Sequence, residues 1–338
     1  MRAVNPRTWS RFALVVLLAA CGTRSGLLSD TEAPDPGFPV ADAALDAPVA
    51  DALPDTSTDA GLDATDAADA EVDAFVDIDA LPPIEAGVAD VDRRDCTDPS
   101  QTLIYVVSSQ NDLYAFDPPT SSFRLVGPLS CPAAAGETPF SMAVDRNGVA
   151  YVVYSDGNLF RVSTRSGACA ATPFAPNQSG FSTFGMGFSS EAGGPAERLF
   201  VMHEDGNGVN PSQLGWIDTR TFKLNIVGTT APPLGRSELT GTGDGRLFAY
   251  APDDFGNGSA LAQLDKSNAR VIGRNRLQAG GAGQAFAFAF WGNDFYIFNS
   301  PGGATTVTRY RPADNSEVVV ATTPATIVGA GVSTCAPQ

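Results

Sequence analysis

The sequence has one histidine and, between Asp30 and Asp95, only two basic residues, Arg93 and Arg94. The lone His203 lies in a predicted exposed loop. No Gly-x-Ser-x-Gly elbow occurs, so a His-dependent hydrolase is not expected. One histidine also cannot complete a usual structural zinc site. The chain has no basic stripe interleaved with aromatics, which argues against nucleic-acid binding. No apolar run after the amino-terminal one is long enough to span a membrane.

The first 21 residues have the order of features of a signal peptide. Arg2, Arg7 and Arg11 are accompanied by no acid and lead into a mostly apolar stretch at 12–18. That stretch is too short to cross a bilayer. It ends in Leu18-Ala19-Ala20-Cys21, and small residues before a cysteine resemble the bacterial lipoprotein box.

In that lipoprotein family the cysteine thiol receives a diacylglyceryl group, the peptide is cut before it, and the new amino terminus is acylated. The resemblance therefore implies a signal peptide at 1–20, lipidation of Cys21 with palmitate-type chains, and a membrane anchor. Gly22 stands where many inner-membrane lipoproteins carry Asp, which implies the outer membrane of the cell envelope. An ordinary secretory signal beside a cysteine is the alternative.

Residues 21–95 are expected to be the lipidated terminus followed by a disordered tether rich in Asp, Ala and Pro. The stretch from Asp30 to Asp95 carries 19 of the 38 acidic residues. Its only aromatics are Phe38 and Phe75, so it buries too little apolar surface to offset the entropy of ordering. A helix is disfavoured because regularly spaced Asp residues repel one another. A disordered chain of this length spans about 50 Å.

Residues 96–338 contain short apolar runs separated by Gly, Asn, Asp and Pro, without a helical period. One module recurs: an inner strand, then three further strands joined by turns. The ends of its third strand are Phe116-Asp117, Val162-Ser163, Ile217-Asp218, Leu264-Asp265 and Tyr310-Arg311, at successive spacings of 46, 55, 47 and 46 residues. A four-stranded unit that repeats about every 45 residues is typical of a β-propeller blade.

This region resembles the β-propeller repeat families in general, and the resemblance implies an architecture without a specific activity. The sequence predicts an all-β fold with five blades; six blades is the alternative if the long interval of 55 residues, which leads to the third copy, hides a weak one. The first copy lacks its inner strand, because Gln101 to Val107 already matches a second strand. Thr326 to Val332 looks like an inner strand without a successor, so we expect it to complete the first blade and close the ring.

Four cysteines remain after Cys21, and an even number in an exported chain favours disulfides, with three connectivities open. Ring closure would bring Cys335 beside Cys96, so we expect that pair. Cys131 and Cys169 then pair by elimination, on the outer strands of adjacent blades. Four free thiols is the alternative.

Candidate chemistry in the propeller region is sparse. The acidic turns at 205–208 and 253–258 have oxygen ligands that suit calcium, yet plain hairpin turns need the same residues. Glu238 is the one acid within a predicted inner strand, and Glu137 lies just before another. A glycoside hydrolase needs two matched carboxylates around the channel. The aromatics Trp216, Trp291, Phe181 and Phe255 would form either a ligand surface or packing between blades.

The sequence thus favours an envelope lipoprotein whose propeller is a noncatalytic binding module, with a glycan or an envelope protein as ligand. A carbohydrate-active enzyme that uses Glu238 is the alternative, and a purely structural envelope component is a third. No cofactor, metal or catalytic residue is predicted, and we expect a monomer.

Overall fold

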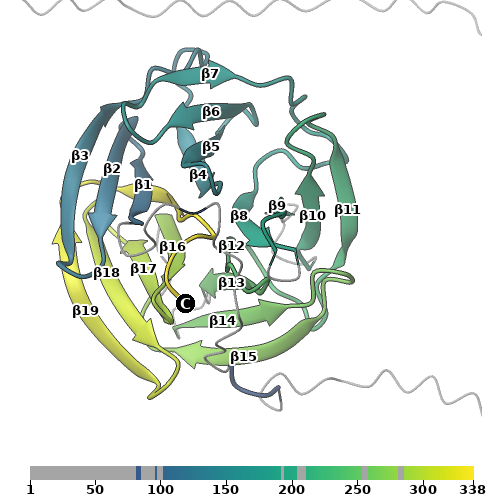
Figure 1. Ribbon diagram of the computed structural model, residues 1–338, viewed down its shortest axis with the longest axis vertical. Coiled ribbons are helices and arrows are strands. Elements are labelled where there is room, and N and C mark those ends of the chain that lie inside the picture. Colours follow the sequence, from purple (N-terminus) through teal and green to yellow (C-terminus); the bar gives the residue numbers. More distant parts are fainter. Residues whose placement is uncertain are drawn as a thin grey trace, which may run out of the picture. The chain divides into compact units, whose positions relative to one another are not determined.

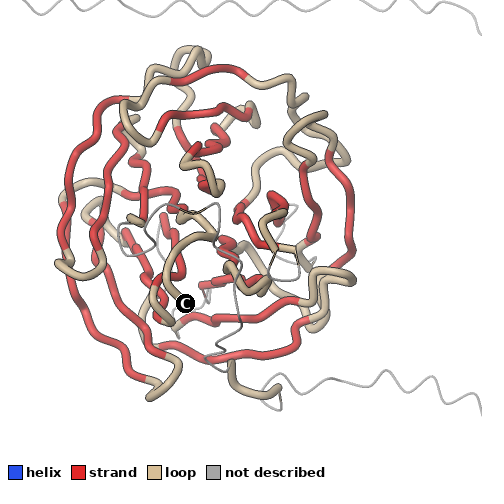
Figure 2. The backbone as a smooth tube through the Cα atoms, in the orientation of Figure 1, coloured by secondary structure: helices blue, strands red, loops and turns tan. Residues whose placement is uncertain are grey.

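This computed structural model describes residues 81–84, 96, 102–191, 194–203, 211–252, 258–280 and 285–338. The described residues form twenty β-strands joined by loops and turns, and no helix (Figure 2). In those ranges nothing forms a helix that could cross a membrane. The predicted signal peptide, Cys21 and most of the predicted tether lie outside the described residues.

The strands form five antiparallel sheets of four, arranged as blades around a central axis (Figure 1). Blade 1 contains β20 (Ile327–Gly331), β1 (Ile104–Ser108), β2 (Asp112–Asp117) and β3 (Ser122–Pro128). Blade 2 contains β4 (Pro139–Val144), β5 (Val149–Tyr154), β6 (Leu159–Ser163) and β7 (Cys169–Ala171). Blade 3 contains β8 (Gly185–Ser190), β9 (Glu197–His203), β10 (Gln213–Ile217) and β11 (Leu224–Thr229). Blade 4 contains β12 (Glu238–Gly241), β13 (Leu247–Pro252), β14 (Ser259–Leu264) and β15 (Val271–Leu277). Blade 5 contains β16 (Ala285–Trp291), β17 (Asp294–Ser300), β18 (Thr305–Arg311) and β19 (Ser316–Thr323).

The five-bladed prediction is confirmed, and the six-bladed alternative is wrong. The long interval of 55 residues, which leads to the third copy, contains two long connections within blade 3, at 191–196 and at 204–212. Neither has enough residues for a further four-stranded sheet, because a strand alone commonly takes about five or six residues.

The carboxyl-terminal strand closes the ring, as the sequence predicts. β20 pairs antiparallel with β1, in the register Tyr105 to Gly331 and Val107 to Gly329. Figure 1 shows this last strand beside β1, at the start of the propeller. Blade 1 is thereby built from both ends of the domain, and the inner strand missing from the first repeat is supplied by the last residues.

Small residues allow the inner strands to approach one another around the axis. A Cβ on Gly187 of β8 would lie 2.9 Å from the Leu239 backbone of β12. A Cβ on Gly331 of β20 would lie 2.8 Å from the Val144 nitrogen of β4. Real Cβ atoms do not approach backbone atoms this closely, so neighbouring inner strands require glycine at these positions.

The apolar core is divided among the gaps between blades. Its buried residues fall into five clusters, one for each pair of neighbouring blades. Of the four aromatics expected either at a ligand surface or in packing between blades, Phe181 is fully buried between blades 2 and 3. Phe295 and Tyr310, which are not among those four, pack between blades 4 and 5. Each blade is therefore held by its two neighbours, and removing one blade would expose two clusters.

Four residues of the predicted tether depart from the expected disorder. Leu81–Ile84 lie against β15, and Ile84 is buried with 4% of its surface exposed. The expectation of disorder over 21–95 is therefore wrong for these four. The local reason is composition, because Leu-Pro-Pro-Ile carries no charge and presents two large apolar side chains, unlike the Asp- and Ala-rich stretch before it.

Two disulfides are present, with the pairing that the sequence predicts. Cys96 is bonded to Cys335, just beyond β20, and this disulfide joins the first and last parts of the chain that forms the propeller. Cys131, which follows β3, is bonded to Cys169 at the start of β7 and joins blades 1 and 2. Two bridges fit an extracytoplasmic domain, because such bonds persist in oxidising compartments.

Removing the two disulfides separately should destabilise the domain unequally. The Cys96–Cys335 bond closes a loop with a sequence separation of 239, against 38 for Cys131–Cys169. In the loop-entropy model, replacing both cysteines by serine costs about 5 kcal/mol for the first pair and about 4 kcal/mol for the second. Guanidinium unfolding of the two double variants measures this difference. An unfolding free energy that falls more in the Cys131→Ser/Cys169→Ser variant would contradict it.

Candidate functional site

The main candidate site is a cavity of about 420 Å³ at the end of the propeller axis where the inner strands begin. Each of the five inner strands contributes lining residues from its first positions or from the residues just before it. The lining residues are Ser109, Thr138, Pro139, Phe140, Thr183, Phe184, Gly185, Met202, Arg236, Ser237, Glu238, Ala285, Phe286 and Val328. We call this space the axial cavity. Its volume lies in the range that small-molecule sites occupy.

The wall of the axial cavity is mainly apolar, with a single cation. Phe140, Phe286 and Met202 supply its larger apolar side chains. The exposed Arg236 is the one basic residue among the described lining residues, and its guanidinium carbon lies 4.9 Å from the ring centroid of Phe286. This cation–π contact positions the positive charge over an aromatic wall while leaving its N–H donors free to point toward a ligand.

Among the lining residues that the structure describes, Glu238 is the one acid, and its side chain is buried inside the ring. It begins β12, where only 4% of its surface is exposed. The Ser141 hydroxyl of β4 donates to Glu238 Oε2 at 2.7 Å, and the Met186 N–H of β8 donates to Ser141 Oγ at 3.2 Å. Three inner strands are therefore linked through one carboxyl group.

Burial raises the pKa of Glu238 well above its usual value. The hydrogen bonds from Ser141 and the Met186 N–H, and the charge of Arg236, oppose the shift without cancelling it. The shift favours the protonated form relative to a solvent-exposed glutamate, and that form has an O–H to donate as well as an oxygen that accepts from Ser141.

The second predicted acid is not brought to the same place. Glu137 is part-exposed on the connection before β4, where its Oε2 accepts a hydrogen bond from Ser155 at 2.6 Å. It is not among the lining residues of the axial cavity. The two carboxyls that the enzyme alternative would need are not brought together here.

His203 ends β9 rather than lying in an exposed loop, so that expectation is wrong. Its Nδ1 lies 2.7 Å from the Thr183 carbonyl oxygen, and its ring centroid lies 5.1 Å from that of Phe181. Pairing of β9 with β10 continues through Gln213 and brings His203 to the edge of the axial cavity, beside Met202. The contact between His203 Nδ1 and the backbone carbonyl of Thr183 stabilises the position of Thr183, which lines the cavity.

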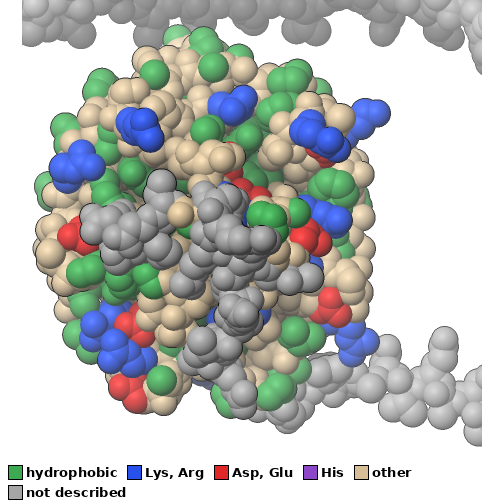
Figure 3. Space-filling model, in the orientation of Figure 1, with side chains coloured by type: hydrophobic (Ala, Val, Ile, Leu, Met, Phe, Trp, Pro, Cys, Tyr) green, Lys and Arg blue, Asp and Glu red, His purple; other side chains and the backbone are tan. Residues whose placement is uncertain are grey.

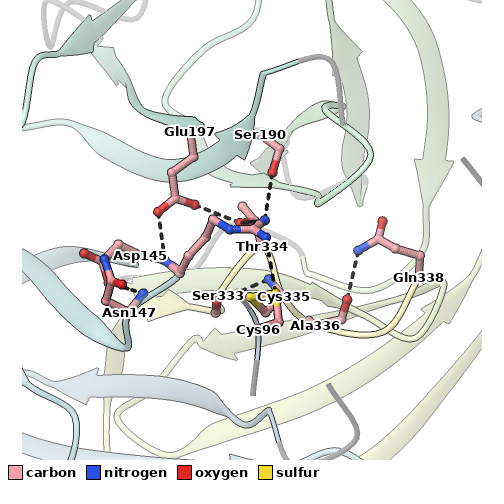
Figure 4. The surroundings of a disulfide bond; sticks show 11 residues. Cys96, Asp145, Asn147, Ser190, Glu197, Ser333, Thr334, Cys335, Ala336 and Gln338 are labelled. Carbon is pink, nitrogen blue, oxygen red and sulfur yellow. Dashed lines mark hydrogen bonds between the residues drawn. A yellow bond between two sulfur atoms is a disulfide. The ribbon is translucent and has the colours of Figure 1, made fainter. Parts of the chain in front are cut away.

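The opposite end of the axis carries a polar cluster around the first disulfide (Figure 4). We call Arg146, Ser190, Glu197, Thr334 and the Cys96–Cys335 bond the clasp cluster. The Arg146 backbone N–H donates to Glu197 Oε1 at 2.8 Å, and Thr334 donates to Glu197 Oε2 at 2.8 Å. The Arg146 guanidinium reaches Ser190, Thr334 and Cys96. Blades 2 and 3 are thus tied to the closing chain.

Glu197 has a pKa of about 7, raised mainly by burial. Its hydrogen bonds from Arg146 and Thr334 oppose the shift, while the nearby charge of Asp145 adds to it. The pKa of Asp145 is itself raised by burial, against hydrogen bonds from the Val149 and Asn147 backbone. No local sequence pattern indicates this cluster, since Glu197 and Thr334 are 137 positions apart.

The remaining predicted sites are placed as follows. The two acidic turns proposed for calcium lie mostly in residues 204–210 and 253–257, outside the described residues. Among the residues that are described, no group of three or more His, Cys, Asp or Glu could hold a metal ion. Trp216 lies in β10, and Trp291 ends β16 with its Nε1 donating to the Thr102 carbonyl.

On the face drawn in Figure 3, basic side chains lie apart from one another around the rim of the propeller.

Comparisons with known proteins identify no family. No protein-family model and no curated protein matches the sequence. Among solved structures, the chain is similar to one titled "Crystal structure of Nidogen/Laminin Complex", with 9% sequence identity and a TM-score of 0.42, over 68% of this chain and 97% of that chain. So distant a likeness says nothing about ligands. The function must be argued from the residues described above.

Replacing Glu197 by Gln should flatten the pH dependence of stability. The unfolded glutamate titrates near its ordinary 4.5 and the folded one near 7, so the folded state holds its proton more tightly. The wild-type unfolding free energy therefore falls as pH rises from about 4.5 to about 7, by up to about 3 kcal/mol. Gln keeps an oxygen for the Arg146 N–H and does not titrate.

Urea unfolding at a series of pH values between 4 and 8 measures this slope. Glu137→Gln is the matched control, since it removes a part-exposed carboxyl far from the clasp cluster. A Glu197→Gln variant with the full wild-type slope would contradict the assignment.

Proposed function

We propose that this protein is a lipoprotein of the bacterial cell envelope whose β-propeller is a noncatalytic binding module, with the axial cavity as its ligand site. The proposal places a signal peptide at 1–20, a lipidated Cys21 that begins a tether over 21–95, and a propeller domain at 96–338. The outer membrane is the proposed location, by the Gly22 argument. Support comes from the lipoprotein-like sequence around Cys21 and from two disulfides that suit an oxidising compartment.

The observation that supports a binding role is that the axial cavity is large enough for a ligand, whereas its described lining residues include only one acid. The axial cavity is large enough for a small molecule and is lined by aromatic side chains. Glycoside hydrolysis needs two carboxyl groups about 5 to 9.5 Å apart. Among the described lining residues only Glu238 is acidic, and its Oε2 is occupied by Ser141. The cavity is therefore better suited to holding a ligand than to cleaving one.

The lining also indicates the chemistry of the ligand. Phe140, Phe286 and Met202 favour an apolar body, which gains from leaving water. Arg236 favours an acidic group, because its planar N–H donors match a carboxylate. Glu238 in its protonated form adds no negative charge to oppose that group. We therefore propose a small ligand with an apolar or aromatic body and one acidic group.

A calorimetric titration with 1-naphthoate tests the cavity on the purified full chain. We expect naphthoate to bind and the uncharged 1-naphthamide to bind more weakly. Arg236→Gln should weaken naphthoate binding by about 10- to 100-fold, as expected for loss of a hydrogen bond to a charged group. Arg165→Gln, which removes an exposed arginine from the turn after β6, is the matched control and should change nothing.

The outcomes separate the alternatives. Equal affinity for naphthoate and naphthamide would remove the acidic group from the ligand description and leave the binding role. Binding that Arg236→Gln does not change would remove the axial cavity as the site. Turnover of a glycoside that is lost in Glu238→Gln would overturn the noncatalytic role in favour of a carbohydrate-active enzyme.

The lipid anchor is tested by replacing Cys21 with serine. Serine has no thiol to alkylate, so the variant should take up no radiolabelled palmitate and should move from the membrane fraction to the soluble fraction. Two or three acyl chains hold far more firmly than one, since each buried methylene contributes about 0.8 kcal/mol. The Cys131→Ser/Cys169→Ser variant keeps Cys21 and should stay labelled. An unlabelled wild-type protein would overturn the anchor.

A further inference from the structure

The outer edge of blade 4 carries a second site, which is independent of the axial cavity. Leu81–Ile84 lie along β15, where the Arg274 N–H donates to the Pro82 carbonyl at 3.0 Å. In Figure 1 this segment is the short blue stretch at the outer side of β15. A main-chain bond to the last strand of a sheet is how an extended peptide adds to a sheet edge.

Two side chains of the segment enter different gaps between blades. Ile84 joins the buried cluster between blades 4 and 5, which also contains Leu277 and Tyr310. Leu81 packs against the cluster between blades 3 and 4, which contains Val271. The segment therefore crosses the outer strand of blade 4 and is anchored on both sides of it. Burial of apolar side chains at both ends is what favours this docked position.

The polar groups beneath Ile84 are arranged to receive a peptide N–H. The Ile84 N–H donates to Asn275 Oδ1 at 2.8 Å, and Asn275 is 9% exposed. The Asn275 amide donates to the Tyr310 hydroxyl, which in turn donates to Asn315 Oδ1 at 2.9 Å. The Asn275 side chain is thus fixed from blade 5, and without the segment its buried oxygen would lose this partner.

The strand below the segment is shaped to let it approach. A Cβ on Gly273 would lie 3.3 Å from the Pro82 carbonyl oxygen and 3.5 Å from Ile84 Cγ1. Pro82 and Pro83 have no N–H, so the docked segment cannot itself become the start of another ladder. The segment fills the edge of blade 4 and stops further strand addition there.

From these contacts we infer that the outer strand of blade 4 is a docking site for an extended apolar-Pro-Pro-Ile peptide, and that the chain fills it with its own Leu81–Ile84. The site does not depend on the proposed ligand of the axial cavity or on lipidation of Cys21.

A peptide added in trans tests the site. The full chain with Ile84→Asp should release its own segment, because a carboxylate cannot enter the apolar cluster between blades 4 and 5. A synthetic peptide with the sequence of residues 78–87 should then bind that variant, as measured by fluorescence anisotropy. Its affinity for the wild-type chain should be at least about tenfold weaker, because the attached segment competes at a high effective concentration.

Two matched changes establish where the peptide binds. Gly273→Val in the Ile84→Asp background should weaken peptide binding by about tenfold or more, since valine suits a strand but crowds Pro82 and Ile84. Ile272→Val, at the adjacent exposed position of β15, should leave binding unchanged. A peptide that carries Asp in place of Ile84 should not bind.

Hydrogen exchange on the wild-type chain gives a readout that needs no variant. The Ile84 and Arg274 amides should exchange slowly, at rates close to those of the amides that pair β14 with β15. Fast exchange at both amides would overturn the inference. So would equal binding of the 78–87 peptide and its Asp version to the Ile84→Asp chain, provided that both disulfides of that chain are intact. Peptide binding that Gly273→Val does not change would also overturn it.

Discussion

The pairing of β20 with β1 is the constraint on which the rest of the structure depends. Each blade of this ring presents two apolar faces, and each face is covered mainly by the neighbouring blade. An open ring would leave the faces of its first and last blades in water, along with an unpaired strand edge. Closure by residues Ile327–Gly331 covers both, and the Cys96–Cys335 bond holds the two chain ends at that junction.

Closure also explains the composition of the inner strands. Five strands that start from one end of the axis must converge, and glycines at positions such as 187 and 331 allow their backbones to approach. The same convergence brings polar groups from separate blades into contact, as when Ser141 of β4 meets Glu238 of β12. The axial cavity is therefore a consequence of ring geometry, and its chemistry depends on the first residues of each inner strand.

The repeat made the architecture predictable, because each blade solves the same local problem with similar residues. The third-strand ends, the missing first strand and the cysteine positions were enough to predict five blades, closure and both disulfides. The contacts of the clasp cluster and of the docked Leu81–Ile84 segment do not repeat from blade to blade. Arg146 and Thr334 are 188 positions apart, and Ile84 and Asn275 are 191 apart, so no local pattern marks them.

The errors have the same physical origin. His203 was expected in an exposed loop because its neighbours in sequence are polar, yet strand pairing with Gln213 extends β9 to include it. Leu81–Ile84 were grouped with an acidic tether by the composition of a long window, although these four residues are themselves uncharged. In both cases a pairing partner outside the local segment determines the structure, Gln213 for His203 and β15 for Leu81–Ile84, and composition averaged over a segment does not reveal it.

The two ends of the axis have different tasks, and the path of the chain separates them. The entering chain reaches the ring at Cys96, in the clasp cluster, and β1 then runs antiparallel to β20 away from that end. The axial cavity opens at the other end, where the inner strands begin. Cys96 and the docked Leu81–Ile84 on the rim of blade 4 therefore both lie away from the cavity lining. Within the described ranges, the cavity lining, Arg236 and the aromatic wall included, comes from the blades and the connections between them, and none of it comes from the chain before β1.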